Sequence, residues 1–167
     1  LDPLLLLLLF TIAGYGLVVL YSAADDHLIA MEKQGGFFVL GFFIMFAVAQ
    51  ISQSTWRFIA PVLYGLGVLL VIAVAIFGEI SMGARRWLDI PGLPRFQPSE
   101  MLKIGLPLML ATYFHEHGTP PRFKHIFWSL VMMALPVVLI IRQPDLGTGL
   151  LVLSSGVIVL FMAGIHW

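Results

Sequence analysis

Three arginines and a lysine lie close together in the stretch RRWLDIPGLPRFQPSEMLKIG, residues 85–105. They are Arg85, Arg86, Arg95 and Lys103, in a chain that is 60% hydrophobic and 11% charged. The planar fork of arginine suits phosphate oxygens, and lysine adds a compact positive charge. Gathered at one surface, these side chains could hold a pyrophosphate. The alternative is contact with anionic lipid headgroups, which needs no specific site.

Glu100 and Lys103 carry charge to the edge of an apolar run, GLPLMLATYF. Residues three apart share a helix face, so these two side chains can form an ion pair. In one interpretation they mark a helix start: Ser99 or Pro98 opens the helix, Glu100 favours its positive end and Lys103 reaches the interface. In the other, ionisable groups in a membrane segment face a polar cavity or a substrate path. The sequence leaves both open.

A second motif, RQPDLGTG, covers residues 142–149. Pro144 should stop the preceding helix, which places Asp145 as N-cap of the next helix with Thr148 at its third position. The functional alternative is a carboxylate beside Arg142 that acts as a general base or positions a divalent cation. If the two apolar segments before Asp145 both cross a membrane, Asp145 and the arginine cluster fall on the same face. We then expect one site.

Three histidines, His115, His117 and His125, lie in the polar segment HEHGTPPRFKH. The spacing H-x-H can bind a metal ion, but no companion ligands accompany it. A solvated loop is therefore expected here, and no metal site is predicted. The sequence also contains no Gly-rich phosphate-binding loop and no GxSxG nucleophile motif.

The composition that surrounds these motifs indicates a membrane protein. Soluble domains have about 25% charged residues, and a chain of 167 residues cannot bury this much apolar surface in water. Nine basic and nine acidic residues balance, which argues against a nucleic-acid partner. Cysteine is absent, so disulfides and thiol chemistry are excluded.

Apolar segments of the length of membrane helices position the charged motifs, and they predict an all-α, polytopic bundle of about six transmembrane helices. The segments are Leu4–Tyr21, Gly35–Ile51, Ile59–Phe77, Met101–Phe114, Ile126–Ile141 and Leu146–Ile165. We expect residues 1–167 to form a single transmembrane helical region with a long loop at about 79–98. The fourth segment is too short to span unless Ser99–Lys103 also lies in the membrane. Because the chain starts at leucine and ends on Trp167, we expect it to be part of a longer chain.

The distribution of basic residues among the loops does not settle the orientation of the chain in the membrane. With a cytoplasmic N-terminus, the inside loops hold Arg57, Arg122 and Lys124. The outside loops hold Lys33, Arg85, Arg86, Arg95 and Arg142. The positive-inside rule predicts the reverse topology, unless the arginines of the two motifs are retained for function.

The motifs GARRWLDIPGLPRFQPSEMLKIGLPLMLA and QPDLGTGLLVLSSGVIVLFMAG resemble those of the SEDS family of bacterial cell-wall glycosyltransferases. The form is closer to the elongation member, RodA, than to the division member, FtsW. The signs are RWLDI running into RFQPSE, and QPDLGT with a leucine after the aspartate. The resemblance extends from LDPLLLLLL to GIHW, so the chain matches the N-terminal part of a larger SEDS fold.

This resemblance implies a peptidoglycan glycosyltransferase that polymerises lipid II at the outer face of the bacterial cytoplasmic (inner) membrane. It implies a multi-pass protein with a cytoplasmic N-terminus, surrounded by membrane lipids and partnered by a class B penicillin-binding protein that crosslinks the product. The aspartate usually assigned as catalytic base lies beyond residue 167, so no residue here inherits that role, and this part alone should be inactive. The resemblance carries over as substrate-binding residues Arg86, Arg95, Glu100, Lys103 and Asp145, with Asp145 as a possible catalytic accessory. No cofactor is implied beyond a possible divalent cation.

Two other functions use the same residues. A flippase or transporter of a lipid-linked precursor would use the charges as a path, but it needs polar groups across the bilayer, and the charges here gather at one face. A non-catalytic membrane scaffold would tolerate changes at Arg95, Lys103 or Asp145. It would not tolerate changes on an outer helix face.

Overall fold

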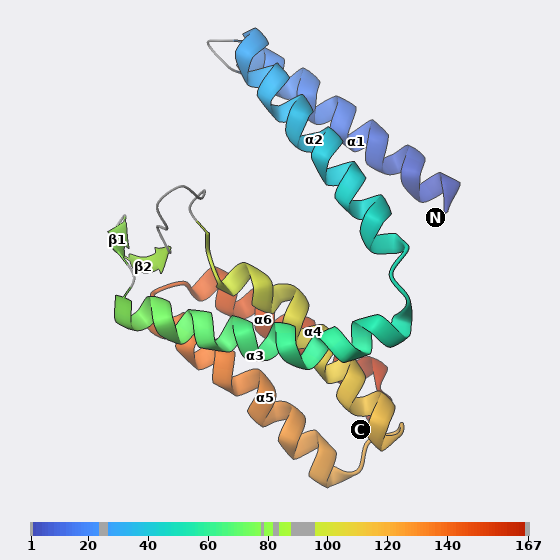
Figure 1. Ribbon diagram of the computed structural model, residues 1–167, viewed down its shortest axis with the longest axis vertical. Helices are drawn as coiled ribbons and strands as arrows, with labels where there is room; N and C mark the ends of the chain where they lie inside the picture. The colour runs from blue at the N-terminus through green and yellow to red at the C-terminus, as the bar shows by residue number, and fades with distance from the viewer. Residues whose placement is uncertain (1, 24–26, 78, 82–83, 88–95, 166–167) are drawn as a thin grey trace. The chain divides into compact units, whose positions relative to one another are not determined.

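The computed structural model describes residues 2–23, 27–77, 79–81, 84–87 and 96–165. All six predicted apolar segments form α-helices, which confirms the all-α fold class (Figure 1). The elements are α1 (Pro3–Ala23), α2 (His27–Ala49), α3 (Gln53–Phe77), β1 (Glu79–Ser81), β2 (Ala84–Trp87), α4 (Ser99–His117), α5 (Phe123–Arg142) and α6 (Leu146–Met162). Contacts divide the chain into two compact units, Leu1–Ser52 and Gln53–Trp167. The single helical region expected over residues 1–167 stays a prediction.

Four of the described helices are long and apolar enough to cross a bilayer: α1, residues Leu28–Ala49 of α2, α3 and α5. α6 is also apolar but shorter, with 17 residues. α4 has 19 residues because it continues into polar sequence at both ends of its apolar run. Glu100 suits the positive N-terminal end of that helix, and histidines suit its negative C-terminal end.

The loop expected around the three histidines is shorter than predicted. His115 and His117 lie in the last turn of α4, and His125 lies in the first turn of α5. Residues 118–122 connect the two helices. The expected loop position of these histidines is therefore wrong, because the helices extend past the apolar runs that were used to predict their ends.

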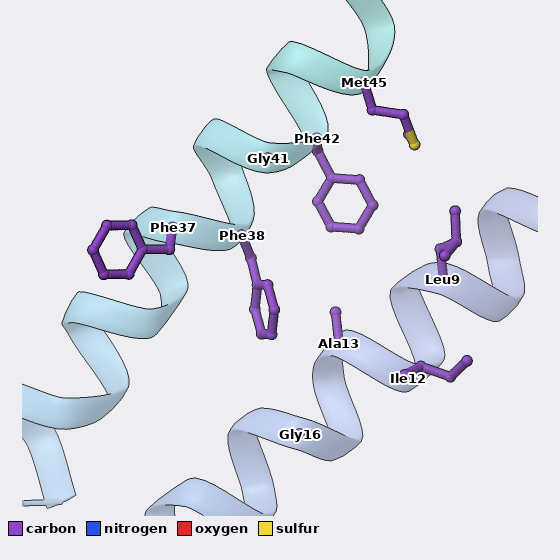
Figure 2. A pocket seen from close by; sticks show the side chains of 9 residues that line it. All are labelled: Leu9, Ile12, Ala13, Gly16, Phe37, Phe38, Gly41, Phe42 and Met45. Atoms are coloured by element: carbon purple, nitrogen blue, oxygen red, sulfur yellow. The ribbon is translucent and has the colours of Figure 1, made fainter. Parts of the chain in front are cut away.

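The first unit is an antiparallel hairpin of α1 and α2. Phe10 of α1 stacks on Phe42 of α2, with ring centroids 4.4 Å apart. Beside this pair lies an apolar groove of about 440 Å³, in which Phe38 and Phe42 point toward α1 (Figure 2). Ala13 and Gly16 line the opposite wall. The groove exists because small residues of α1 face large aromatic residues of α2.

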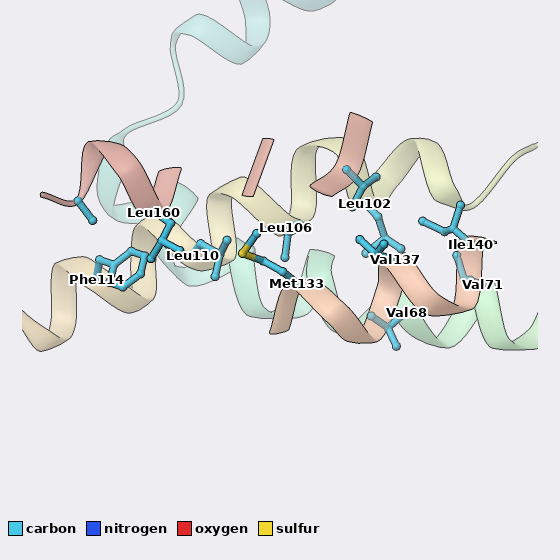
Figure 3. Close-up of a cluster of buried hydrophobic side chains, with 12 residues drawn as sticks. Val68, Val71, Leu102, Leu106, Leu110, Phe114, Met133, Val137, Ile140 and Leu160 are labelled. Carbon is cyan, nitrogen blue, oxygen red and sulfur yellow. The ribbon is translucent and has the colours of Figure 1, made fainter. Parts of the chain in front are cut away.

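The core of the second unit lies where α3, α4, α5 and α6 meet, and each of these helices contributes apolar side chains (Figure 3). Leu102, Leu106 and Leu110 are fully buried and recur every four residues along one face of α4. Val71 of α3 and Ile140 of α5 pack into the same cluster. α4 contacts all three other helices of this unit, as does α5.

Glycines allow α3 and α4 to approach closely. A side-chain carbon at Gly105 would lie 3.3 Å from the backbone nitrogen of Tyr64. A side-chain carbon at Gly67 would lie 2.9 Å from Cδ2 of Leu102. Small residues at a helix interface allow the two helix backbones to approach each other closely. The pairing shows that α3 and α4 run antiparallel, so the end of α3 that leads into the long loop lies beside the start of α4.

The long loop predicted at about 79–98 begins with a short hairpin. β1 and β2 pair antiparallel, with Ile80 opposite Arg85 and Ser81 opposite Ala84. The register shifts between Glu79 and Ile80, which marks a bulge. No hairpin was predicted here, because a strand of three or four residues is too short to show an alternating pattern.

Candidate functional site

The starts of α4 and α6 meet at the end of the second unit that carries the charged motifs. Gln97 immediately precedes the turn into α4, and Asp145 immediately precedes α6. Nε2 of Gln97 donates a hydrogen bond of 2.8 Å to Oδ2 of Asp145. The structure therefore joins the two sequence motifs directly, across 48 residues of chain.

Asp145 is the N-cap of α6, as the sequence predicted. The backbone N–H of Thr148 donates to Oδ1 of Asp145 at 3.3 Å. The residue is 8% exposed, so this carboxylate is held inside the protein rather than in solvent. Each carboxylate oxygen accepts a hydrogen bond from a different motif, which fixes the orientation of the group. A buried, oriented negative charge at this place can balance a cationic neighbour or ligand.

Glu100 and Lys103 form the predicted ion pair. Nζ of Lys103 lies 2.7 Å from Oε1 of Glu100, with side chains 32% and 51% exposed, respectively. An ion pair this exposed contributes about 0–1 kcal/mol to stability. Lys103 has three N–H donors, and within the described residues one of them has a protein acceptor, Glu100. The remaining donors can therefore bind an anionic ligand.

Gln97 and Ser99 belong to this site, although the sequence did not single them out. The amide nitrogen of Gln97 that reaches Asp145 also donates to Oγ of Ser99 at 2.9 Å. Ser99 is almost completely buried, and it is the first residue of α4. The sequence feature that could have identified them is the motif RFQPSE, in which two hydrogen-bonding side chains flank the proline before a helix.

A second glutamine, Gln143, anchors the turn before Asp145. Its Nε2 donates to the backbone carbonyl of Val71 at 2.8 Å, and the side chain is buried. This bond ties the end of α5 to α3. The sequence placed Gln143 inside the RQPDLGTG motif but gave no indication of its partner, which lies 72 residues away.

The predicted arginines are described to different extents. Arg86 lies in β2 by its backbone, and its side chain falls outside what the structure describes. Arg95 lies outside the described residues altogether. Phe96 begins the described segment that leads into α4. The site that the structure does describe thus consists of Gln97, Ser99, Glu100, Lys103 and Asp145.

The histidines lie at the opposite end of α4 from this site. His117 donates from Nδ1 to the backbone carbonyl of Tyr113 at 2.8 Å, and the Tyr113 hydroxyl is hydrogen-bonded to Nδ1 of His125 at 2.9 Å. His115 accepts a hydrogen bond from the guanidinium of Arg57. Over the part of the chain that the structure describes, no group of three or more histidine and acidic side chains is arranged to hold a metal ion.

Known proteins are similar to this chain in sequence and in fold. A family model for FtsW, RodA and SpoVE, described as "Cell cycle protein", matches residues 3–167. The peptidoglycan glycosyltransferase MrdB of Escherichia coli (strain K12) is 42% identical over 167 residues, which are 100% of this chain and 45% of the relative.

Solved structures agree with this match. The crystal structure of the Thermus thermophilus rod shape determining protein RodA has a TM-score of 0.84 at 32% identity, covering 99% of this chain and 55% of that one. A chain from a peptidoglycan synthase complex that coordinates polymerization and crosslinking has a TM-score of 0.85 at 34% identity, covering 99% and 48%. The chain spans about half the length of these relatives. It belongs to the family of cell cycle proteins that includes FtsW, RodA and SpoVE, and within that family it is of the RodA type.

Proposed function

We propose that the whole protein is a peptidoglycan glycosyltransferase that polymerises lipid II into glycan strands during cell elongation. The observation that carries this proposal is the 42% identity, over the full chain, to the peptidoglycan glycosyltransferase MrdB. The two charged motifs and the contact between them lie within the matched region. Because the chain spans about half of that relative, activity belongs to the complete protein rather than to these 167 residues.

Glycan polymerisation needs two kinds of chemical help. A base must take the proton of the acceptor sugar hydroxyl, whose oxygen then bonds to the anomeric carbon of the donor sugar. The bond from that carbon to the polyprenyl pyrophosphate breaks, and the departing negative charge must be stabilised. We assign the second task to Arg86, Arg95 and Lys103. The base lies beyond residue 167.

Glu100 and Asp145 have supporting roles in this proposal. Glu100 holds the ammonium of Lys103 at the start of α4, and Lys103 can exchange that contact for a pyrophosphate oxygen when substrate arrives. The buried carboxylate of Asp145 balances the positive charge of the surrounding side chains and keeps Gln97 in place. A divalent cation beside these carboxylates would assist the same leaving group.

Location and partner follow from the same relatives. The membrane-spanning helices and the identity to MrdB support a multi-pass protein of the bacterial inner membrane. We propose a cytoplasmic N-terminus, which puts residues 79–98 and Asp145 on the outer face, where lipid II is polymerised. The structural neighbour in a synthase complex for polymerization and crosslinking supports a transpeptidase partner, a class B penicillin-binding protein.

The test is lipid II polymerisation by the full-length protein, purified with its penicillin-binding partner. Lys103→Ala and Asp145→Asn are compared with wild type. Lys124→Ala is the matched control, because it removes a positive charge from the opposite end of the second unit. We expect Lys103→Ala to lower glycan synthesis about a hundredfold, as loss of a donor to a developing negative charge does. Lys124→Ala should polymerise at the wild-type rate.

Two outcomes contradict the proposal. If Lys103→Ala and Asp145→Asn both polymerise normally while still assembled with the partner, these charges are helix caps and interface anchors. If wild type itself makes no glycan, the transport and scaffold functions take precedence. Assembly with the partner must be checked for each variant by size-exclusion chromatography, so that a loss of complex is not mistaken for a loss of chemistry.

A further inference from the structure

A second hollow lies at the other end of the α3–α6 unit, between the first turns of α3 and the last turns of α4. It has a volume of about 360 Å³. Its rim is polar and includes Gln53, Arg57 and His115. Its floor is formed by Trp56, Leu108 and Ala111. None of these residues takes part in the site around Asp145.

This hollow and the Asp145 site belong to opposite membrane surfaces. At 1.5 Å per residue, Glu100 and His115 are roughly 22 Å apart along the axis of α4. α3 runs antiparallel to α4, so the start of α3 meets the end of α4, where Arg57 bonds His115. The separation is about three quarters of the thickness of the hydrocarbon core, about 30 Å, so the two sites lie in opposite halves of a bilayer. A ligand in this hollow therefore approaches from the other leaflet.

Among the residues that the structure describes, the cation on the rim, Arg57, has no anionic partner. Arg57 donates to the imidazole of His115, a contact with a group that carries no negative charge. Within the described residues, the ion pair that forms is Lys103 with Glu100, and Arg57 has no carboxylate beside it. A guanidinium presents several N–H donors in a plane, which suits the two free oxygens of a phosphodiester.

The polar and apolar parts of the hollow are arranged like a phospholipid. Ala111 and Leu108 lie about one and two turns before His115 on α4, toward the middle of the helix and therefore toward the bilayer interior. Trp56 is of the residue type that favours the membrane interface. With its headgroup at the rim, a phospholipid would therefore have its acyl chain along the floor, pointing toward the bilayer interior.

The charge of the surrounding surface selects among lipids. Arg122 immediately precedes α5 and Lys124 lies in its first turn, at the same end of the unit, and Glu116 is the acidic residue of the adjoining end of α4. A zwitterionic headgroup adds a positive charge beside its phosphate, and that charge is repelled by Arg57, Arg122 and Lys124. An anionic headgroup lacks that positive charge, and the basic residue that its phosphodiester contacts directly, Arg57, contributes most to binding.

We propose that this hollow binds an anionic glycerophospholipid, with its phosphodiester on Arg57 and His115 and an acyl chain over Ala111 and Leu108. The site holds a lipid of the leaflet opposite the Asp145 site. It stands independently of the glycosyltransferase function, because its evidence consists of the hollow, a guanidinium without a carboxylate partner among the described residues, and the order of polar and apolar residues along α4.

The test measures lipid retention by the full-length protein. The purified protein in detergent is titrated with phosphatidylglycerol or phosphatidylcholine, and bound lipids are counted by native mass spectrometry. We expect phosphatidylglycerol to bind more tightly, and Arg57→Gln to weaken it about fivefold or more. Lys124→Gln is the matched control: it removes the same charge from the same end outside the hollow, and it should change binding less than twofold.

A third variant tests the floor without changing charge. Ala111→Phe fills the hollow, and we expect it to weaken phosphatidylglycerol binding as much as Arg57→Gln does. Should Ala111→Phe melt at a lower temperature than wild type, the comparison of Arg57→Gln with Lys124→Gln still decides the matter. Excess inorganic phosphate should not displace the lipid, because the acyl chain contributes to binding.

Four results would overturn the proposal. Equal losses for Arg57→Gln and Lys124→Gln would mean diffuse attraction to a basic surface. Equal binding of phosphatidylcholine would mean an apolar groove without charge selection. Displacement by inorganic phosphate would mean a site for the ion rather than for a lipid. Wild-type binding by a folded Ala111→Phe variant would mean that the floor is not used.

Discussion

Asp145 offers the sharpest test of the site. Substitution by alanine removes both its hydrogen bonds and its charge, whereas substitution by asparagine removes the charge and can keep the hydrogen bonds. Asp145→Ala removes, among the contacts of this side chain, the hydrogen bonds from Thr148 and Gln97. Loss of an N-cap side chain costs about 1 kcal/mol. Loss of a hydrogen bond to a charged group costs about 1.5–3 kcal/mol, here the bond of 2.8 Å from Gln97. We expect the free energy of unfolding to fall by about 3 kcal/mol in total.

Asp145→Asn should cost much less. Asparagine caps helices about as well as aspartate, so the bond from Thr148 is retained. The amide of Gln97 can turn over, so that its oxygen accepts from asparagine and from the hydroxyl of Ser99. One charge-assisted bond then becomes a neutral one, at a cost of about 1 kcal/mol. The fold is kept while the negative charge is removed.

The assay is reversible unfolding of the full-length protein in mixed micelles, with the fraction folded followed by circular dichroism. A loss for Asp145→Ala below about 1 kcal/mol would refute the reasoning, because the cap alone should cost that much. An equal loss for alanine and asparagine would also refute it, since the charge would then be required for folding. If Asp145→Asn folds but makes no glycan, the carboxylate serves the reaction rather than the fold.

Two further predictions concern the packing that positions this site. Gly105→Val should lower the free energy of unfolding by about 1–3 kcal/mol, because a side-chain carbon at this position would lie 3.3 Å from the backbone of α3. The control is Gly65→Val, where a side-chain carbon would meet no atom within 4 Å. This control should be nearly neutral in the same unfolding assay. An equal effect of both glycine variants would contradict the close approach of α3 and α4. Gln143→Met should cost about 1 kcal/mol by removing the buried bond to Val71, and differential scanning calorimetry should show a lower melting temperature; an unchanged melting temperature would mean that the turn before α6 is held without this bond.

Local features of the chain could be predicted because their physical causes lie within a few residues. Apolar runs predicted all six helices, although the fourth run was shorter than a membrane span. The order proline, aspartate and then threonine three residues later predicted the N-cap of α6. The spacing of Glu100 and Lys103 allowed their ion pair, and the structure decided for Lys103 over an arginine as the described partner of Glu100. Helix ends were less accurate, since the polar residues at both ends of α4 continue a helix that hydropathy alone does not follow.

The family, too, was determined by the sequence, through two motifs whose residues and order are specific. The roles assigned to Arg86, Arg95, Glu100, Lys103 and Asp145 rest on that resemblance and stay predictions. Arg95 lies outside the described residues, and so does the side chain of Arg86. For the other three, the structure adds the neighbours of each side chain.

The tertiary structure decided the contacts between parts of the chain that are distant in sequence. Gln97 meets Asp145 across 48 residues, Arg57 meets His115 across 58 and Gln143 meets Val71 across 72. No local pattern specifies such partners, because an amide or a guanidinium bonds equally well to many acceptors. The packing of α3, α5 and α6 around α4 brings these groups within bonding distance. The sequence thus determined which helices form and which family they belong to, and helix packing decided which polar side chains meet.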